Sequence, residues 1–105
     1  MLNVNNIGYN RLALLERTGA LRLLVSLLDG DLYITQLIKR GEGFGIASQP
    51  AIEKTRTALA KLDLIEEYEV FVDLIKKTRL YVKLTNKGEK VARNIKKVVL
   101  FLSEP

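Results

Sequence analysis

The chain has 105 residues, a length that favours one domain, and 48% of them are hydrophobic, which is enough to bury a core. Because it contains neither Cys nor His, it has no thiol nucleophile, no imidazole acid–base group and no Cys/His zinc site. Its 17 Lys and Arg residues outnumber its 12 Asp and Glu residues, which gives a net charge of +5. No set of carboxylates suggests a metal site or paired acid–base groups, so we expect no metal, no cofactor and no enzyme activity.

We expect no targeting signal and no membrane span in this sequence. Residues 1–6 have neither a basic segment nor a long apolar run, so they do not form a signal peptide. The longest unbroken apolar run is 98–102, and a membrane-spanning helix needs about 20 residues. We therefore expect a cytoplasmic protein that makes no membrane contact.

Two helices are predicted in the first 29 residues. A short leucine-rich stretch over 10–17 predicts the first, within a helical extension that covers 1–19. The second covers 20–29, where apolar residues recur at the i, i+3, i+4, i+7 spacing of a helix. Because further leucines widen this stripe, we expect the second helix at the centre of the core. The stripe consists of Leu21, Leu24, Val25 and Leu28, widened by Leu23 and Leu27.

A short strand and a short helix are predicted next. Residues 32–34 are β-prone, and Thr35 is placed to cap a helix over 36–40. Three glycines within 41–45 then predict a turn in which they provide conformational freedom.

A third helix is predicted over 48–62. Ser48 is placed to cap it, and Pro50 lies in its first turn, where a missing N–H is harmless. The expected buried stripe is Ile52, Thr55, Ala58, Leu59 and Leu62. The residues expected to point away from it are Glu53, Lys54, Arg56, Thr57 and Lys61.

Two β-prone stretches, 64–72 and 78–84, predict a hairpin. The second alternates apolar and polar residues, as a half-buried strand does. The connection over 73–77 contains no Gly or Asn, so it is not a tight two-residue turn. Glu67 and Glu69 on the first strand are expected to face Arg, Tyr or Lys side chains on the second.

Charge is distributed unevenly along this part of the chain. Residues 63–73 include five acidic residues and no basic one, whereas 74–97 include nine basic residues and one acidic residue. Such a basic segment suits a polyanion such as nucleic acid. The alternative is an ordinary solvated face, in which the two stretches partly pair with each other.

A last helix is predicted over 86–105. Thr85 or Asn86 is placed to cap it, and Glu89 completes a capping box with Asn86. Its apolar stripe continues to the end of the chain, which favours a partner helix, most simply from a second copy. The alternative is that it packs on the N-terminal helix of its own chain. The predicted dimerisation residues are Val91, Ile95, Val98 and Leu102.

Three segments, in this order and spacing, carry a resemblance to a known family. Residues 32–37 are similar to the strand that enters a helix-turn-helix, and 46–54 with 59–65 are similar to the family's I-S-x-x-x-V…L-x-x-L-G-L-I run. The sequence Leu-Thr-Asn-Lys-Gly over 84–88 is similar to the L-T-x-x-G that follows the wing. The chain thus resembles the archaeal and bacterial winged helix-turn-helix DNA-binding transcriptional regulators of the broad MarR/HxlR/ArsR type.

The resemblance implies an α+β fold, a winged helix-turn-helix with a three-helix core and a β-hairpin wing. In this interpretation 20–85 form the winged-helix core, after the short N-terminal helix of the extension over 1–19. A C-terminal helix over 86–105 follows and serves in dimerisation. All three parts belong to a single domain over 1–105.

The resemblance also implies a sequence-specific regulator that binds double-stranded DNA as a homodimer. Helix 48–62 would enter the major groove, and the basic wing over 73–79 would lie on the backbone or in the minor groove. Gln49 can pair with adenine through two hydrogen bonds, and Ala51 can contact a thymine methyl group. The expected DNA-binding residues are Ser48, Gln49, Ala51, Lys54, Arg56, Thr57, Lys76, Lys77 and Arg79.

The sequence departs from the family pattern at two places, and the second of them favours an alternative function. Asp63 stands where the family usually has glycine after the recognition helix, and 70–75 are more apolar than a wing on the DNA backbone requires. With the acidic stretch before it, this apolar tip is also typical of a protein–protein interaction module in a multi-subunit assembly. No residue pattern identifies a small-molecule effector.

Overall fold

The computed structural model describes residues 4–105. Its elements, in chain order, are α1 (Val4–Leu15), α2 (Ala20–Ser26) with a 3₁₀ turn (Leu27–Asp29), β1 (Leu32–Tyr33), α3 (Ile34–Gly43), α4 (Gln49–Lys61), β2 (Ile65–Val72), β3 (Lys77–Leu84) and α5 (Asn86–Leu102).

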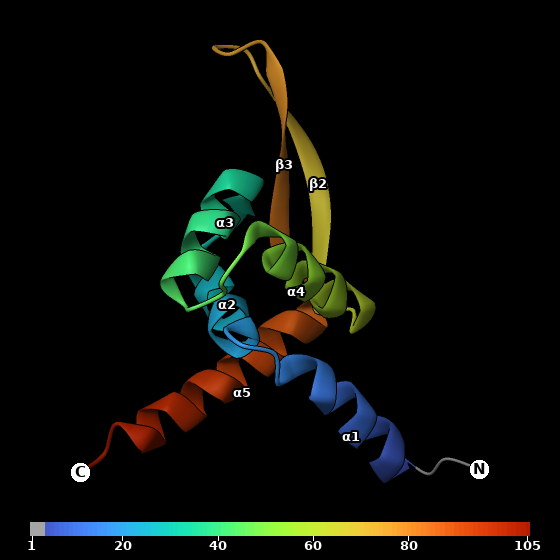
Figure 1. The fold of residues 1–105 in the computed structure, drawn as a ribbon, viewed down its shortest axis with the longest axis vertical. Coiled ribbons are helices and arrows are strands. Elements are labelled where there is room, and N and C mark those ends of the chain that lie inside the picture. Colours follow the sequence, from blue (N-terminus) through green and yellow to red (C-terminus); the bar gives the residue numbers. More distant parts are fainter. Residues whose placement is uncertain (1–3) are drawn as a thin grey trace.

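The arrangement of these elements is that of a winged helix (Figure 1). Helices α2, α3 and α4 form the body, and β2 and β3 extend beyond it as a long hairpin, the wing. Helices α1 and α5 project from the other side of the body. The predicted α+β fold is therefore confirmed, including an added helix before and after the three-helix core.

Helix α2 lies at the centre of the core, as predicted. Leu23 and Leu24 are fully buried, whereas Leu21 and Leu28 are only half-buried. The α-helix ends at Ser26, before the predicted end, because the last turn tightens into a 3₁₀ turn. The largest fully buried apolar side chains of the other elements are Leu37, Ile52, Leu59 and Val82.

The predicted cap of α3 is wrong. The helix begins at Ile34 with Tyr33 as its N-cap residue, so Thr35 lies inside the first turn. The Gln36 side chain causes this earlier start, since its Oε1 accepts a hydrogen bond from the Tyr33 backbone N–H at 3.1 Å. A glutamine three residues after the cap residue commonly fixes a helix start in this way.

The predicted glycine-rich turn is partly helical. Gly41 and Gly43 belong to α3, and only Gly45 has a left-handed φ, of 87°. Gly41 is buried, and a Cβ there would lie 3.1 Å from Cγ1 of Ile52. The glycine at this position therefore allows α3 and α4 to approach closely, while Gly45 alone serves the turn.

The sheet has the strand order β1-β3-β2, with both pairs antiparallel. Its register places Glu67 opposite Val82 and Glu69 opposite Leu80, so the expected pairing of these glutamates with polar residues of β3 is wrong. Glu66 instead contacts Lys83, with 3.4 Å between Oε1 and Nζ. A shift of one residue in register exchanges the two faces of a strand, and sequence alone did not fix it.

The joint between α4, β2 and α5 explains two features of the family motifs. Asp63 has a φ of 59°, a left-handed conformation that glycine adopts more easily and Asp tolerates. Thr85 donates two hydrogen bonds across the joint, from N to Leu64 O at 3.0 Å and from Oγ1 to Asp63 O at 2.6 Å. A Cβ at Gly88 would lie 1.8 Å from Leu64 O, so the glycine of the L-T-x-x-G motif permits this contact.

Helix α5 changes its surroundings along its length. Thr85, not Asn86, is the N-cap residue, because its Oγ1 accepts a hydrogen bond from Gly88 N at 2.9 Å. Gly88 and Ala92 are buried against the body, whereas 98–102 are exposed where the helix projects away (Figure 1). Within residues 4–105, no helix combines the length and the apolar character needed to cross a membrane.

Candidate nucleic-acid interface

Helix α4 presents its first turn to solvent in a fixed orientation. Ser48 is its N-cap residue, as predicted, and its Oγ accepts a hydrogen bond from Ala51 N at 3.2 Å. Ile52 and Thr55 are buried, and they set the rotation of the helix about its axis. Gln49 is exposed in this turn, whereas Ala51 is half-buried and packs against the core.

Arg56 connects α4 to the wing. Its Nη1 donates a hydrogen bond to Glu67 Oε1 on β2 at 2.6 Å, and its Nη2 donates one to Glu53 Oε2 on α4. The Arg56 side chain is only 19% exposed. Two carboxylates thus hold the guanidinium, and the sequence pattern gave no sign of this bridge because Glu67 is distant along the chain.

Lys54 and Thr57 lie beside the end of α1. Together with Leu14 and Arg17 they line a shallow pocket of about 350 Å³. The Thr57 hydroxyl donates to Glu53 O at 2.9 Å within its own helix. Arg17 is an exposed cation that sequence reasoning did not assign to this surface, since only the fold brings the α1–α2 connection next to α4.

The three predicted basic residues of the wing occupy two environments. Lys76 and Lys77 are exposed at the tip, where Lys76 has a left-handed φ of 53°. Within the described part of the chain, neither lysine lies within ion-pair distance of a carboxylate. Arg79 lies lower on β3, half-buried, with its guanidinium carbon 4.4 Å from the ring centre of Tyr33. The structure therefore leaves two free cations at the tip and packs the third.

Three tyrosines join the base of the wing to the body. The Tyr81 ring stacks on Tyr68, with 5.4 Å between ring centres, and meets Tyr33 edge-on at 5.8 Å. The Tyr68 hydroxyl donates a hydrogen bond to Asp31 Oδ2 at 2.6 Å. This hydrogen bond, together with desolvation and the negative charge of Asp31, raises the pKa of Tyr68 to about 12. The tyrosines thus pack against one another and do not stand free as base-stacking rings.

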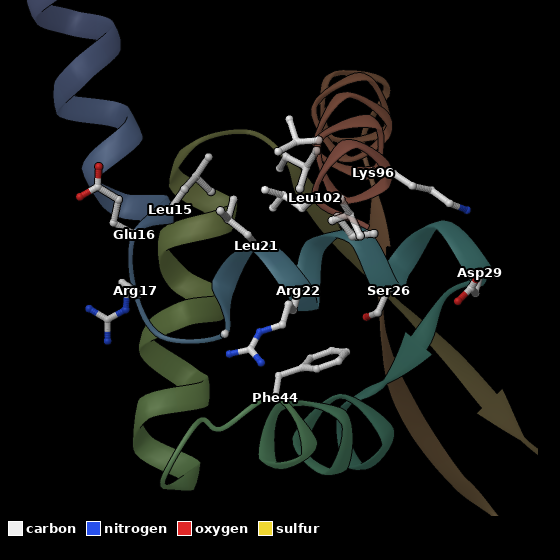
Figure 2. Close-up of a pocket in the computed structure, with 15 residues that line it drawn as sticks. Leu15, Glu16, Arg17, Leu21, Arg22, Ser26, Asp29, Phe44, Lys96 and Leu102 are labelled. Carbon is white, nitrogen blue, oxygen red and sulfur yellow. The ribbon is translucent and has the colours of Figure 1, made fainter. Parts of the chain in front are cut away.

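An apolar pocket of about 670 Å³ lies between α2 and α5, on the side of the body from which α5 projects. Figure 2 shows Leu15 and Leu21 on one side of it and Leu102 on another. The Arg22 guanidinium carbon lies 5.9 Å from the ring centre of Phe44, another lining residue. Of the four predicted dimerisation residues, three line this pocket: Ile95, Val98 and Leu102.

Val91, the fourth predicted dimerisation residue, lies elsewhere. It is half-buried and lines a smaller pocket of about 200 Å³ with Leu12 and Leu15 of α1. Although α1 also lines this pocket, α5 packs chiefly against α2, so it does not pack along the N-terminal helix as the alternative interpretation expected. Only the second half extends freely.

No group of three or more acidic residues in residues 4–105 is arranged to hold a metal ion. The charged residues of the candidate interface are instead cations on the wing and around α4, together with the glutamates that bind Arg56. The exposed cations of this surface are complementary in charge to an anionic partner.

Comparisons with solved structures show which known proteins share this fold. No family model and no curated protein matches the chain. A solved structure described as a MarR-family regulator from Porphyromonas gingivalis W83 aligns with a TM-score of 0.74 and 16% identity, over 99% of this chain and 96% of that one. The repressor BigR from Xylella fastidiosa aligns with a TM-score of 0.68 and 18% identity, over 96% of this chain and 91% of that one.

The reduced form of the regulator YodB from B. subtilis is similar as well, with a TM-score of 0.70 and 15% identity over 96% of this chain and 91% of that one. These alignments cover nearly the whole of each chain, so the helices before and after the three-helix core are part of the shared fold. The chain has the winged-helix fold of MarR-type regulators, as the sequence resemblance implied.

Proposed function

We propose that the protein is a sequence-specific transcriptional regulator that binds double-stranded DNA as a homodimer in the cytoplasm. The observation that carries the proposal is the Arg56–Glu67 bridge, which fixes the recognition helix relative to a basic wing. A helix and a wing held at a fixed separation can enter one groove and contact the adjacent backbone together. Binding, and not catalysis, is the proposed activity.

The proposed base contacts come from the first turn of α4. Gln49 is exposed there and can pair with adenine, while Ser48 can contact a phosphate with its hydroxyl, which also caps the helix. Lys54 and Thr57 follow on the exposed surface, next to Arg17, which we add as a phosphate contact. Ala51 remains a candidate for a thymine methyl contact at the margin of this surface, since it is half-buried.

The proposed wing contacts are led by Lys76 and Lys77. Among residues 4–105, no carboxylate lies within ion-pair distance of either lysine, so their charges are available to phosphates. Arg79 and Arg56 remain proposed contacts with a second task, because Arg79 packs on Tyr33 and Arg56 binds two glutamates. We expect these two arginines chiefly to position the wing and the helix.

The proposed dimer forms through α5, with the winged-helix core over 20–85 as the DNA-binding unit. Val98 and Leu102 are 54% and 79% exposed, and with Ile95 they line the apolar pocket beside α2. A second copy of α5 would fill this pocket and cover the exposed side chains of Val98 and Leu102. Two copies related by a two-fold axis would present two recognition helices to a pseudo-palindromic site.

The test is fluorescence anisotropy with a random-sequence DNA duplex over a series of salt concentrations. Each phosphate contact contributes about 0.9 to the slope of log affinity against log salt. We expect the Lys76→Ala/Lys77→Ala variant to lower this slope by up to about 2 per bound chain. The preferred sequence would then be obtained by selection from a random pool.

The matched control is Lys90→Ala/Lys97→Ala, which removes the same charge from exposed positions on α5, on the opposite side of the body from the wing. Its slope should equal that of the unchanged protein. Equal slopes for the unchanged protein and both variants would contradict the proposed wing contacts, and an absence of salt-sensitive binding would contradict the DNA-binding function.

A second candidate function is that of a protein–protein interaction module in a multi-subunit assembly. One observation favours it, namely the exposed apolar side chains near the wing tip, Phe71 and Leu74. A chain that stays monomeric, binds no duplex and purifies with one partner protein would support this function over the first.

A further inference from the structure

The wing is a long hairpin whose tip exposes apolar side chains. Leu74 is 96% exposed, which is the largest exposure among the large hydrophobic residues of the described chain. Phe71 and Ile75, on either side of it along the hairpin, are 58% and 43% exposed. The wing carries this tip well beyond the three-helix body, so no other element among residues 4–105 covers it (Figure 1). Exposed apolar residues that gather in this way commonly mark a contact with a partner.

The charges next to this apolar point are mainly positive. Lys76 and Lys77 follow directly, and among residues 4–105 no carboxylate lies within ion-pair distance of either. Asp73 is the one acidic residue of the four-residue connection between β2 and β3. An apolar side chain next to two unpaired cations is complementary to a partner such as duplex DNA, whose phosphates lie outside its stacked, largely apolar bases.

The size of the tip also argues for DNA over a protein. A stable protein interface buries about 800 Å² on each partner, from roughly 20–30 residues. The end of a two-stranded ribbon offers only its short connection and the residues next to it. One or two apolar side chains are, however, sufficient to enter between base pairs from the minor groove, where they partly unstack one step and kink the duplex by about 20–90°.

We propose that Leu74 is a minor-groove wedge. It enters a base step, Ile75 supports it, and Lys76 and Lys77 hold the phosphates on either side. The inference rests on the proposed function, since it requires that the wing reaches duplex DNA. A wedge unstacks and bends the bound duplex locally, whereas a wing that only contacts the phosphate backbone does not.

The test uses a short alternating dA–dT duplex in which 2-aminopurine replaces a central dA. Every second step of this duplex is the TA step, which is easily unstacked, and 2-aminopurine fluorescence rises on unstacking. A second copy of the duplex carries a donor and an acceptor dye at its ends to report bending. Anisotropy in the same salt series reports binding, and the variants compared are Leu74→Ser and Leu74→Met.

The unchanged protein and Leu74→Met should raise both the 2-aminopurine signal and the energy transfer. Leu74→Ser should lose both changes, yet still bind with the same salt slope, because its lysines are intact. Val70→Ser removes an apolar side chain farther from the tip and should behave as the unchanged protein does.

Three results would overturn the wedge, and they are distinguishable. Binding by Leu74→Ser with undiminished fluorescence and energy transfer would overturn the wedge alone. A smaller assembly for Leu74→Ser than for the unchanged protein in sedimentation would assign the tip to a protein contact. An absence of salt-sensitive binding by the unchanged protein would overturn the DNA-binding function and the wedge together.

Discussion

The wing tip and the free half of α5 both expose apolar side chains, but their neighbours differ. At the wing tip Leu74 is 96% exposed, with Lys76 and Lys77 close by. On α5 the run over 98–102 contains no charged residue, and Val98 and Leu102 line a pocket of about 670 Å³. The wing tip is thus a small apolar surface next to cations, whereas the second half of α5 is an apolar helix face next to a pocket.

This difference teaches that exposure alone does not identify a partner. A contiguous apolar helix face with a pocket beside it suits a second helix, which can bury the large area that a stable dimer needs. A small apolar point with unpaired cations suits the groove of a polyanion. The two regions lie on opposite sides of the three-helix body, so a dimer formed through α5 leaves both wings free (Figure 1).

The largest effect is expected from the double substitution Val98→Asp/Leu102→Asp. It places two charges on the proposed dimer face, where each central apolar contact contributes about 2 kcal/mol. Together the two substitutions should remove about 4 kcal/mol of dimerisation free energy. The dissociation constant of the dimer should therefore rise by close to a thousandfold. Sedimentation velocity over a range of protein concentrations measures this change directly.

Leu100→Asp is the matched control for that substitution. Leu100 is 61% exposed in the same run, but it faces the other side of the helix from Val98 and Leu102 by the helical repeat. Leu100→Asp should leave the dimer intact. If it dissociates the dimer as strongly as the double variant does, the contact does not follow the predicted stripe.

The second effect concerns the joint that connects the two regions. Gly88→Ala would place a Cβ 1.8 Å from Leu64 O, so α5 must move away from the connection between α4 and β2. We expect a loss of about 3 kcal/mol in the free energy of unfolding, measured by urea denaturation. Because the joint serves both regions, dimer formation and DNA binding should weaken together.

Gly43→Ala provides the comparison for Gly88→Ala. Gly43 is exposed in α3, and nothing lies within 4 Å of the Cβ that the substitution would add. Its free energy of unfolding should rise slightly, by up to about 1 kcal/mol, because alanine restricts the unfolded chain. A Gly88→Ala variant as stable as this one would show that the joint is not closely packed.

The sequence predicted the parts of the fold that depend on local signals. Ser48 and Thr85 were both placed correctly as possible caps, since a hydroxyl before a helix is a local pattern. Thr35 was placed wrongly, because the Gln36 side chain satisfied the backbone of Tyr33 instead. Where two local signals compete, the sequence alone does not decide between them.

Contacts between distant segments were not predictable in the same way. Glu67 binds Arg56 and not a residue of β3, because the register places it on the face of the sheet toward α4. Arg17 reaches the surroundings of α4 only through the path of the α1–α2 connection. Residue types predicted the cations of the candidate site, but the fold decides which of them are free and which are held by glutamates or rings.

The smallest effect is expected at the base of the wing, from Tyr68→Phe. The substitution removes the hydrogen bond to Asp31 that holds the wing against the body, so the melting temperature should fall slightly at pH 7.

The pKa of Tyr68 is about 12 in the folded protein, above the value of 10.0 for a free tyrosine. The stabilisation is therefore fully present below pH 10 and is lost as the pH rises toward 12. The difference in melting temperature between the unchanged protein and Tyr68→Phe should shrink over this range, and comparing the two proteins cancels the titration of the lysines. A difference that stays constant from pH 8 to pH 12 would show that the hydroxyl does not hold the wing, whereas α5 and its dimer should be unaffected by the substitution at any pH.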